Sequence, residues 1–415
     1  MTDTIKPRDA KEVEAAIAWA LGDGKSLEIV GHRSKRALGR PSQTDATLDL
    51  SALTGVTLYE PEELVLSAKA GTPIAEIEAL LASRGQALAF EPMDLGPLLG
   101  GTPGAGTIGG VLAANLSGPR RIKAGAARDH ILGFAGVSGR GETFKSGGRV
   151  VKNVTGYDLS KLMAGSFGTL AAMTDVTVKT LPRAETEATV LVLGLDEARA
   201  VAAMTAAMGS SCDVSGAAHL PEKIALRASD DVPVGHAVTA LRLEGVAPSV
   251  EHRRTALAEL MKPFGPLSGL NEPQSRVLWR AIRDVIPFAA SAAAGTGEVG
   301  ATERPVWRLS TAPSKGAELA RLIAARANTE FLYDWAGGLV WAALAPSDDA
   351  GAAIVRSAIA QCGGHATLIR APAAVRAAVA VFEPQPGPLA ALTKRVKESF
   401  DPSGVLNPGR MWAGV

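Results

Sequence analysis

The stretch from residue 96 to residue 118 constrains the fold of this chain more than any other segment. It is crowded with Gly, Pro, Thr and Asn, yet it carries few charges. Linkers in contact with water usually carry charge, so uncharged, glycine-rich backbone indicates close packing against another group. Within this stretch Gly104–Gly109 reads GAGTIG and matches the GxGxxG pattern. Asp129 lies 20 residues beyond Gly109, as in a dinucleotide-binding fold.

The residues before these glycines argue against the dinucleotide-binding (Rossmann) interpretation. That fold needs a buried parallel strand running into the loop, but Leu98–Pro103 contains two glycines and a proline. In the alternative interpretation, successive backbone N–H groups point at one anion, and the start of a following helix adds its positive end. Thr107, Asn115 and Ser117 offer further polar contacts. Such a loop can hold the diphosphate of a flavin, although this segment alone does not exclude an ordinary tight turn.

Length and hydrophobic periodicity predict a two-domain α+β protein. The 415 residues, 47% of them hydrophobic, are too many for one ordinary domain. Residues 1–183 alternate helices and strands, residues 184–385 have the pattern of a separate α+β cap domain, and we expect residues 386–415 to return to the first domain. The patterns predict helices at 13–21, 73–84, 159–164, 195–208, 250–261, 315–327, 348–361 and 388–400, strands at 27–30, 56–59, 64–70, 87–90, 131–137, 142–145, 170–181, 237–243, 306–310, 338–343 and 367–370, and a loop at 287–305.

Charge and cysteine content exclude several classes of protein. The 43 basic and 42 acidic residues balance to +1, which gives no general reason for binding nucleic acid or an anionic membrane. Cys212 and Cys362 cannot supply the roughly four thiolates of an iron–sulfur cluster, and they form no disulfide framework. Residues 1–11 do not resemble a signal peptide, and no apolar run reaches membrane-spanning length. We therefore expect a cytoplasmic protein, with any peripheral attachment at the inner membrane made through partners.

Basic residues gather in two places despite the balanced total. One cluster lies within residues 32–40, and the other lies between Arg120 and Lys152. Both fit solvated surface patches, and both equally fit an anionic ligand, such as a pyrophosphate, lying nearby.

Four motifs, in the same order along the chain, resemble those of the vanillyl-alcohol-oxidase family. The motifs are VGHRSK at 30–35, PGAGTIGG at 103–110 with Asn115 and Gly118 following, GSFGTL at 165–170, and FDPSGVLNPGR at 400–410. The resemblance implies a PCMH-type FAD-binding domain and noncovalent FAD. Some members attach the flavin through a histidine, but Ser34, not His32, holds that position here. The cofactor-binding residues implied are Gly31, His32, Arg33, Ser34, Lys35, Pro103, Gly104, Ala105, Gly106, Thr107, Gly109, Gly110, Asn115, Ser117, Gly118, Gly168, Leu170 and Asn407.

Within that family, four further segments resemble the FAD-binding subunits of glycolate oxidases. They are GHRSKRALGR at 31–40, VVKNVTGY at 150–157, YDWAGG at 333–338 and GGHATLIR at 363–370. The resemblance implies oxidation of a small 2-hydroxy acid, glycolate, to glyoxylate. It also implies a complex with a second FAD-binding subunit and an iron–sulfur subunit. The shortage of cysteine fits an electron path that continues in a partner.

Three residues of the second domain are candidates for substrate chemistry. A histidine suits removal of the hydroxyl proton because its pKa lies near neutrality, and an arginine suits a carboxylate through paired hydrogen bonds. We name His365 as the base and Arg308 and Arg370 as carboxylate ligands; an ordinary loop histidine and salt-bridged arginines are the alternatives. The domain lacks the HxGDGN signature of related flavin-dependent hydroxy acid dehydrogenases. A stand-alone dehydrogenase of another hydroxy acid or alcohol, and a noncatalytic scaffold subunit, therefore also stay open.

Overall fold

The chain folds into two units. The computed structural model describes residues 3–148, 156–290 and 302–415. The first unit contains residues 1–117, 125–183 and 384–415, and the second contains residues 118–124 and 184–383. The short segment 118–124 thus departs from the expected boundary. Most of the glycolate-oxidase-like segment 150–157 and the centre of the expected 287–305 loop lie outside the described residues.

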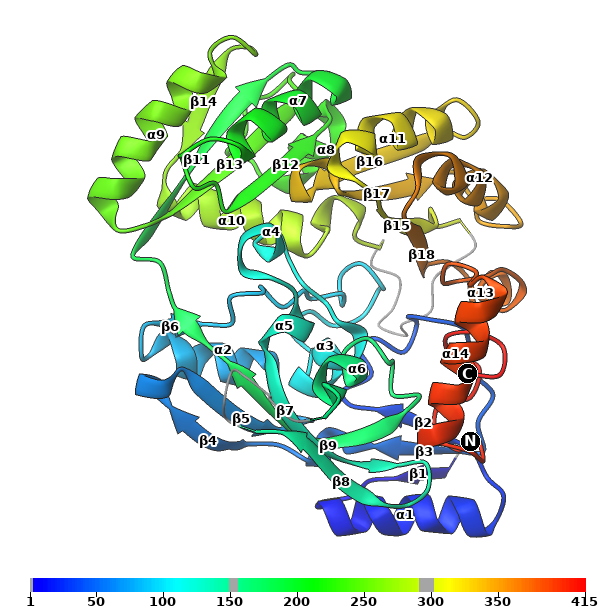
Figure 1. Ribbon diagram of the computed structural model, residues 1–415. Coiled ribbons are helices and arrows are strands. Elements are labelled where there is room, and N and C mark those ends of the chain that lie inside the picture. Colours follow the sequence, from blue (N-terminus) through cyan, green and yellow to red (C-terminus); the bar gives the residue numbers. More distant parts are fainter. Residues whose placement is uncertain (1–2, 149–155, 291–301) are drawn as a thin grey trace. The chain divides into compact units, whose positions relative to one another are not determined.

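A small parallel sheet and one helix form the amino-terminal part of the first unit (Figure 1). Strands β1 (Asp3–Ile5), β3 (Ala46–Asp49) and β2 (Leu27–Val30) pair in that order. Helix α1 (Ala10–Gly22) begins at Asp9, whose carboxylate accepts the Glu12 N–H, and it buries one apolar face, as predicted. The carboxy-terminal segment joins this sheet through a parallel bridge between Leu27 and Leu406.

The second sheet of the first unit has five antiparallel strands. Their order is β4 (Val56–Glu60), β5 (Val65–Lys69), β9 (Ala171–Lys179), β7 (Ile131–Ser138) and β8 (Thr143–Gly147), which confirms the strands and the hairpin expected there. The strand predicted over 87–90 is wrong, because β6 covers only Gln86–Ala87 and pairs with β10 (Leu181–Pro182). Leu88 and Phe90 are nevertheless buried, so the apolar pattern of this segment reflects burial of the side chains and does not indicate a strand.

Short helices connect these sheets. Helix α2 (Ile74–Ala82) follows Pro73, one residue later than expected, since the Thr72 hydroxyl donates to the Lys69 carbonyl instead of capping the helix. The other helices of the unit are α3 (Ile108–Ala114), α5 (Ala127–His130), α6 (Leu159–Met163) and α14 (Gly387–Phe400). Residues 88–106, all described, contain no strand. The Rossmann interpretation of the GxGxxG motif is therefore wrong.

One antiparallel sheet of eight strands forms the second unit. The order is β14 (Leu267–Leu270), β11 (Thr186–Leu193), β13 (Val238–Gly245), β12 (Gly216–Leu220), β16 (Thr329–Asp334), β17 (Leu339–Leu344), β15 (Val306–Ser310) and β18 (His365–Arg370). Its helices are α4 (Arg121–Ala124), α7 (Glu197–Met208), α8 (Glu222–Ala228), α9 (Ala247–Met261), α10 (Glu272–Arg283), α11 (Gly316–Ala324), α12 (Ala352–Cys362) and α13 (Ala373–Ala378). The four helices and four strands expected here are confirmed, whereas β11, β12, β14, β16, α4, α8, α10 and α13 had not been predicted.

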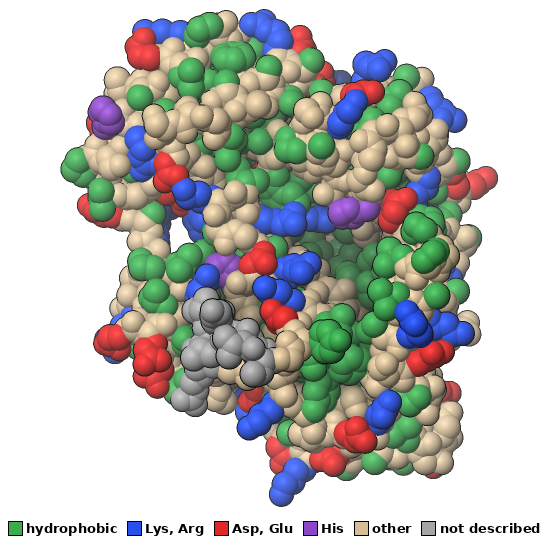
Figure 2. Space-filling view, viewed as in Figure 1, with side chains coloured by type: hydrophobic (Ala, Val, Ile, Leu, Met, Phe, Trp, Pro, Cys, Tyr) green, Lys and Arg blue, Asp and Glu red, His purple; other side chains and the backbone are tan. Residues whose placement is uncertain are grey.

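Aliphatic side chains form a large cluster in the core of the second unit, in addition to its fully buried aromatic residues Trp279, Trp307, Trp341 and Tyr333. Helices α7 and α9 bury Ala200, Met204 and Leu257 against Val190 and Leu241 of the sheet. None of the described helices is long and apolar enough to cross a membrane. Basic and acidic side chains are interspersed over the face seen in Figure 2, in keeping with the nearly neutral net charge.

Candidate cofactor site

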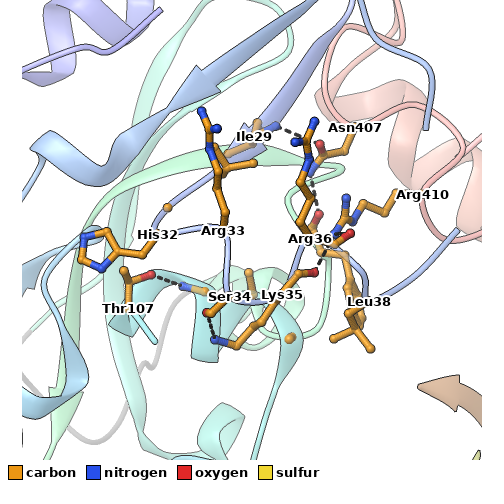
Figure 3. A pocket seen from close by; sticks show the side chains of 16 residues that line it. Ile29, His32, Arg33, Ser34, Lys35, Arg36, Leu38, Thr107, Asn407 and Arg410 are labelled. Atoms are coloured by element: carbon orange, nitrogen blue, oxygen red, sulfur yellow. Dashed lines mark hydrogen bonds between the residues drawn. The ribbon is translucent and has the colours of Figure 1, made fainter. Parts of the chain in front are cut away.

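Two loops that are far apart in the sequence meet in the first unit and line one pocket (Figure 3). Residues 29–36, which comprise the end of β2 and the loop after it, form one side, and Thr107 with Gly110, Ala113 and Ala114 of α3 forms another. The contact is tight, because a Cβ added at Gly31 would lie 2.9 Å from the Thr107 Oγ1. The structure therefore brings together the two glycine-containing segments that the sequence analysis assigned to one anion.

Thr107 organises the helical side of this pocket. Its hydroxyl accepts the Gly110 N–H at 3.2 Å and so caps the start of α3. A Cβ at Gly110 would lie 3.1 Å from that hydroxyl and 3.6 Å from the Lys35 Nζ. The N–H groups of Ile108 and Gly109 donate to the carbonyls of Thr72 and Ala70, so at Gly110 the contribution of glycine is the absence of a side chain, which lets a phosphate approach closely.

Lys35 is the basic residue of the pocket whose charge has no acidic partner among the described residues. Its ammonium contacts the Ser34 hydroxyl at 3.4 Å. Burial lowers the Lys35 pKa to about 8, and the attraction of Asp94 offsets this only in part. A desolvated ammonium beside glycine backbone that a phosphate can approach closely fits a diphosphate, which is the anionic part of FAD.

The neighbouring arginines differ from Lys35 because each has a carboxylate partner. Arg36 pairs with Glu28 at 2.7 Å, and Arg410 lies 3.7 Å from the same residue. Arg33, in a left-handed backbone conformation, pairs with Asp49 at 3.6 Å. These arginines hold the loop in place.

Asn407 joins three segments at the edge of the pocket. Its side-chain oxygen accepts the Ile29 N–H at 2.9 Å, and its amide donates to the Phe167 carbonyl at 2.8 Å. A Cβ at Gly168, which has a φ of +71°, would lie 2.8 Å from the Asn407 amide nitrogen. The GSFGTL and LNPG motifs therefore meet here, and the close contact between them depends on glycine at position 168.

Eight of the residues predicted for the cofactor line the pocket, and the rest do not. The lining residues are Gly31, His32, Arg33, Ser34, Lys35, Thr107, Gly110 and Asn407. The segment 103–106 precedes the pocket wall, and the Gly109 N–H donates to the Ala70 carbonyl at 2.8 Å. Asn115 accepts the Arg128 N–H, Ser117 accepts the Ala127 N–H, and Leu170 is buried. Gly118 belongs to the second unit. Most of these residues shape the loop around the pocket.

Sequence reasoning missed several lining residues that are apolar or small. Ile29, Val30, Leu38, Ala113, Ala114 and Phe167 line the pocket together with Arg36 and Arg410. Ile29 and Val30 are the last residues of a strand that was predicted from the sequence. Their position directly before the loop at 31–36 could therefore have identified them as lining residues. Phe167 lies inside the GSFGTL motif and has a φ of +54°.

The three substrate candidates of the second unit have different surroundings. His365 begins β18 opposite Ser310 of β15, and burial followed by the charge of Arg308 lowers its pKa. Arg308 lies with its guanidinium carbon 5.0 Å from the Trp335 ring. Arg370 is buried and donates to the backbone carbonyls of Phe288 and Arg304 at 2.6–3.1 Å. Because the fold uses its donors, this geometry argues against Arg370 as a carboxylate ligand.

Comparison with known proteins agrees with the fold. Residues 3–147 match the FAD binding domain family. The structure of p-cresol methylhydroxylase with substrate bound superposes with a TM-score of 0.71 over 99% of this chain and 88% of that one, at 14% identity. Together they define an FAD-binding protein with a PCMH-type, vanillyl-alcohol-oxidase-like fold.

Sequence similarity narrows this class to one family. The chain is 34% identical over 396 residues to glycolate oxidase subunit GlcE of Escherichia coli, covering 95% of each chain. An 87-residue stretch, 21% of this chain and 18% of the other, is 42% identical to glycolate oxidase subunit GlcD of Bacillus subtilis. The chain belongs to the GlcE family.

Proposed function

We propose that this chain is the FAD-binding subunit of a complex that oxidises glycolate, a 2-hydroxy acid, to glyoxylate. The full-length similarity to GlcE supports this substrate, since it covers 95% of both chains. The observation that carries the cofactor assignment is the pocket between residues 29–36 and the start of α3.

In this proposal the residues of the pocket bind FAD without a covalent bond. The ammonium of Lys35 binds the diphosphate, which approaches the backbone closely at Gly31 and Gly110, and the side chain of Asn407 holds the Phe167 backbone in place. Bound FAD supplies the hydride acceptor for C2 of the substrate. The protein contributes orientation and the electrostatic field around the cofactor.

For the second unit we propose His365 as the base and Arg308 as a carboxylate ligand. The lowered pKa of His365 leaves its imidazole neutral at pH 7, the form that accepts a proton. Activity should therefore fall as the pH drops from neutrality through this lowered pKa. In the variant His365→Gln, kcat should be strongly lowered and the fall of activity at low pH should be absent, while FAD stays bound.

We further propose that the complex includes a GlcD-like FAD subunit and an iron–sulfur subunit. The GlcD and GlcE relatives both bear the name glycolate oxidase, which supports a multi-subunit assembly. With two cysteines in its sequence, this chain cannot hold a four-thiolate cluster, so electrons leaving the flavin need a partner.

A scaffold role is the second candidate, and one feature favours it. Where related dehydrogenases have HxGDGN, this chain has Asp334–Gly338, whose turn contains Trp335 and Ala336 in left-handed conformations. A scaffold would bind FAD weakly, or it would hold a flavin that no substrate reduces.

The decisive experiment is a visible spectrum of the purified chain followed by anaerobic addition of glycolate, with and without the partner subunits. We expect a flavin spectrum near 1 FAD per chain that glycolate bleaches in the assembled complex. Gly110→Val should prevent FAD binding, whereas Gly22→Val, at a site with nothing within 4 Å of the added Cβ, should not. A colourless chain, or flavin in the complete complex that glycolate leaves oxidised, would contradict the proposal.

A further inference from the structure

Two guanidinium groups of the second unit lie against the same tryptophan ring. The Arg121 guanidinium carbon is 4.2 Å from the Trp335 ring centroid, and that of Arg308 is 5.0 Å away. Stacking on an aromatic face stabilises each cation, but two like charges around one ring repel each other. In agreement, the Arg308 pKa is lowered to about 10, first by burial and next by Arg121. This arrangement gains stability when an anion joins it.

Arg308 has donors available for such an anion. Within the described ranges it makes no hydrogen bond or ion pair, whereas Arg356 on the opposite face of β15 donates to the carbonyls of Ala366, Ala380 and Phe382. Asp334 attracts Arg308, but more weakly than Arg121 repels it, and its carboxylate accepts the Trp335 N–H at 2.7 Å. Guanidinium groups usually satisfy their five N–H donors, so an arginine with this freedom indicates a ligand position.

The register of the sheet puts His365 beside this arginine. Ser310 of β15 pairs with His365 of β18, and Arg308 pairs with Thr367. Side chains alternate along a strand, so Arg308, Ser310, Thr367 and His365 share one face of the sheet. Arg308 and Arg121 both lower the His365 pKa after burial, and Glu383 opposes them. Two cations and a neutral imidazole therefore lie close together.

Arg121 is held firmly, although its segment is short. Residues 118–124 continue directly from the cofactor loop in sequence but fold with the second unit. The Gly118 carbonyl accepts the Trp335 indole N–H at 3.1 Å, and Arg120 donates to Glu244 through its Nε at 3.0 Å. Lys123 pairs with Asp213. These contacts hold the segment on both sides of Arg121, at Arg120 and at Lys123, so its guanidinium is preorganised on the ring.

We propose that Arg121 and Arg308, stacked on Trp335, form a carboxylate-binding site for a small organic acid, with His365 accepting a hydrogen bond from its hydroxyl group. A planar carboxylate matches the planar donor edges of two guanidinium groups better than a spherical or tetrahedral anion does. The identification of this acid with the oxidised substrate depends on the proposed function; the binding site does not.

Oxalate binding to the purified full-length protein with FAD, measured by isothermal titration calorimetry, tests the site. Oxalate has the size of glycolate and cannot be oxidised at C2. We expect saturable binding that weakens about tenfold to a hundredfold in Arg121→Gln and in Arg308→Gln, as for loss of a charged hydrogen-bonded partner. Arg308→Lys, which keeps the charge but loses the planar donors, should fall between. Arg326 is an exposed arginine of the same unit, and Arg326→Gln should bind oxalate like the wild type. Flavin absorbance and the melting temperature of each variant check FAD content and folding.

Glycolate turnover separates this inference from the proposed function. In one outcome the protein fails to oxidise glycolate while Arg121→Gln and Arg308→Gln still weaken oxalate binding. That result would support the carboxylate site and contradict the proposed function. If folded Arg121→Gln and Arg308→Gln complexes keep the wild-type KM for glycolate, the two arginines do not bind the substrate. Absence of saturable oxalate binding, equal affinity in the variants, or displacement of oxalate by equimolar inorganic phosphate would overturn the carboxylate site itself.

Discussion

Replacing Lys35 with methionine should weaken FAD binding and, at the same time, stabilise the protein without FAD. In the apoprotein the Lys35 ammonium is desolvated and has no carboxylate partner among the described residues. Its pKa is lowered from 10.5 to about 8. Each pKa unit corresponds to about 1.4 kcal/mol, so the buried charge costs the apoprotein on the order of 3 kcal/mol. This is an upper bound, because the side chain keeps part of its contact with water.

With FAD bound, the same ammonium faces the diphosphate. A charge-assisted hydrogen bond contributes roughly 1.5–3 kcal/mol, so Lys35→Met should raise the dissociation constant of FAD about tenfold to a hundredfold at pH 7. The diphosphate favours the protonated lysine, which raises its pKa in the complex. Wild-type affinity should therefore decrease as the pH rises above about 8, and Lys35→Met should lack this decrease.

Flavin fluorescence quenching on titration of the apoprotein measures the affinity, and urea denaturation of the apoprotein measures the stability. Lys262→Met, an exposed lysine paired with Glu259 in the second unit, removes the same charge and should change neither quantity appreciably. The reasoning is refuted if Lys35→Met binds FAD within twofold of the wild type at pH 7, or if its affinity shows the same pH dependence.

Three further substitutions test how the fold holds the pocket and the second unit. Lys397→Met should lower the free energy of unfolding by roughly 3–5 kcal/mol in urea, because it leaves the fully buried carboxylate of Asp401 without its 2.6 Å partner, whereas Lys394→Met on the exposed side of α14 should be nearly neutral. Asn407→Ala should destabilise by roughly 1–3 kcal/mol and loosen FAD, since the Ile29 N–H loses its acceptor; an unchanged melting temperature would contradict this. Burial lowers the pKa of His219 to about 4, so stability should be lost as the pH falls from about 6.5 to 4, and a pH titration of unfolding in His219→Gln should lack that loss.

Local sequence patterns were sufficient for many elements of this fold and for the class of cofactor. The apolar face of α1, the hairpin of β7 and β8 and the glycine-rich loop before α3 depend on neighbouring residues, and their signals are visible in short windows. The motifs around residues 31, 107, 168 and 407, taken in order, indicated a flavin protein. The same windows failed at residues 88–90, where burial without strand geometry produces the same apolar pattern.

Only the tertiary structure decided which of the candidate residues work together. Lys35 and Arg36 are adjacent in sequence, yet Glu28 pairs with Arg36 and leaves the Lys35 ammonium to the pocket. Arg308 and Arg370 looked equivalent as carboxylate ligands, but backbone carbonyls use the donors of Arg370, while Arg308 stacks on Trp335. Contacts between segments distant in sequence decide whether a charged side chain pairs with a group of the protein or stays available to a ligand. Those contacts form only when the whole chain packs, so no local pattern encodes them.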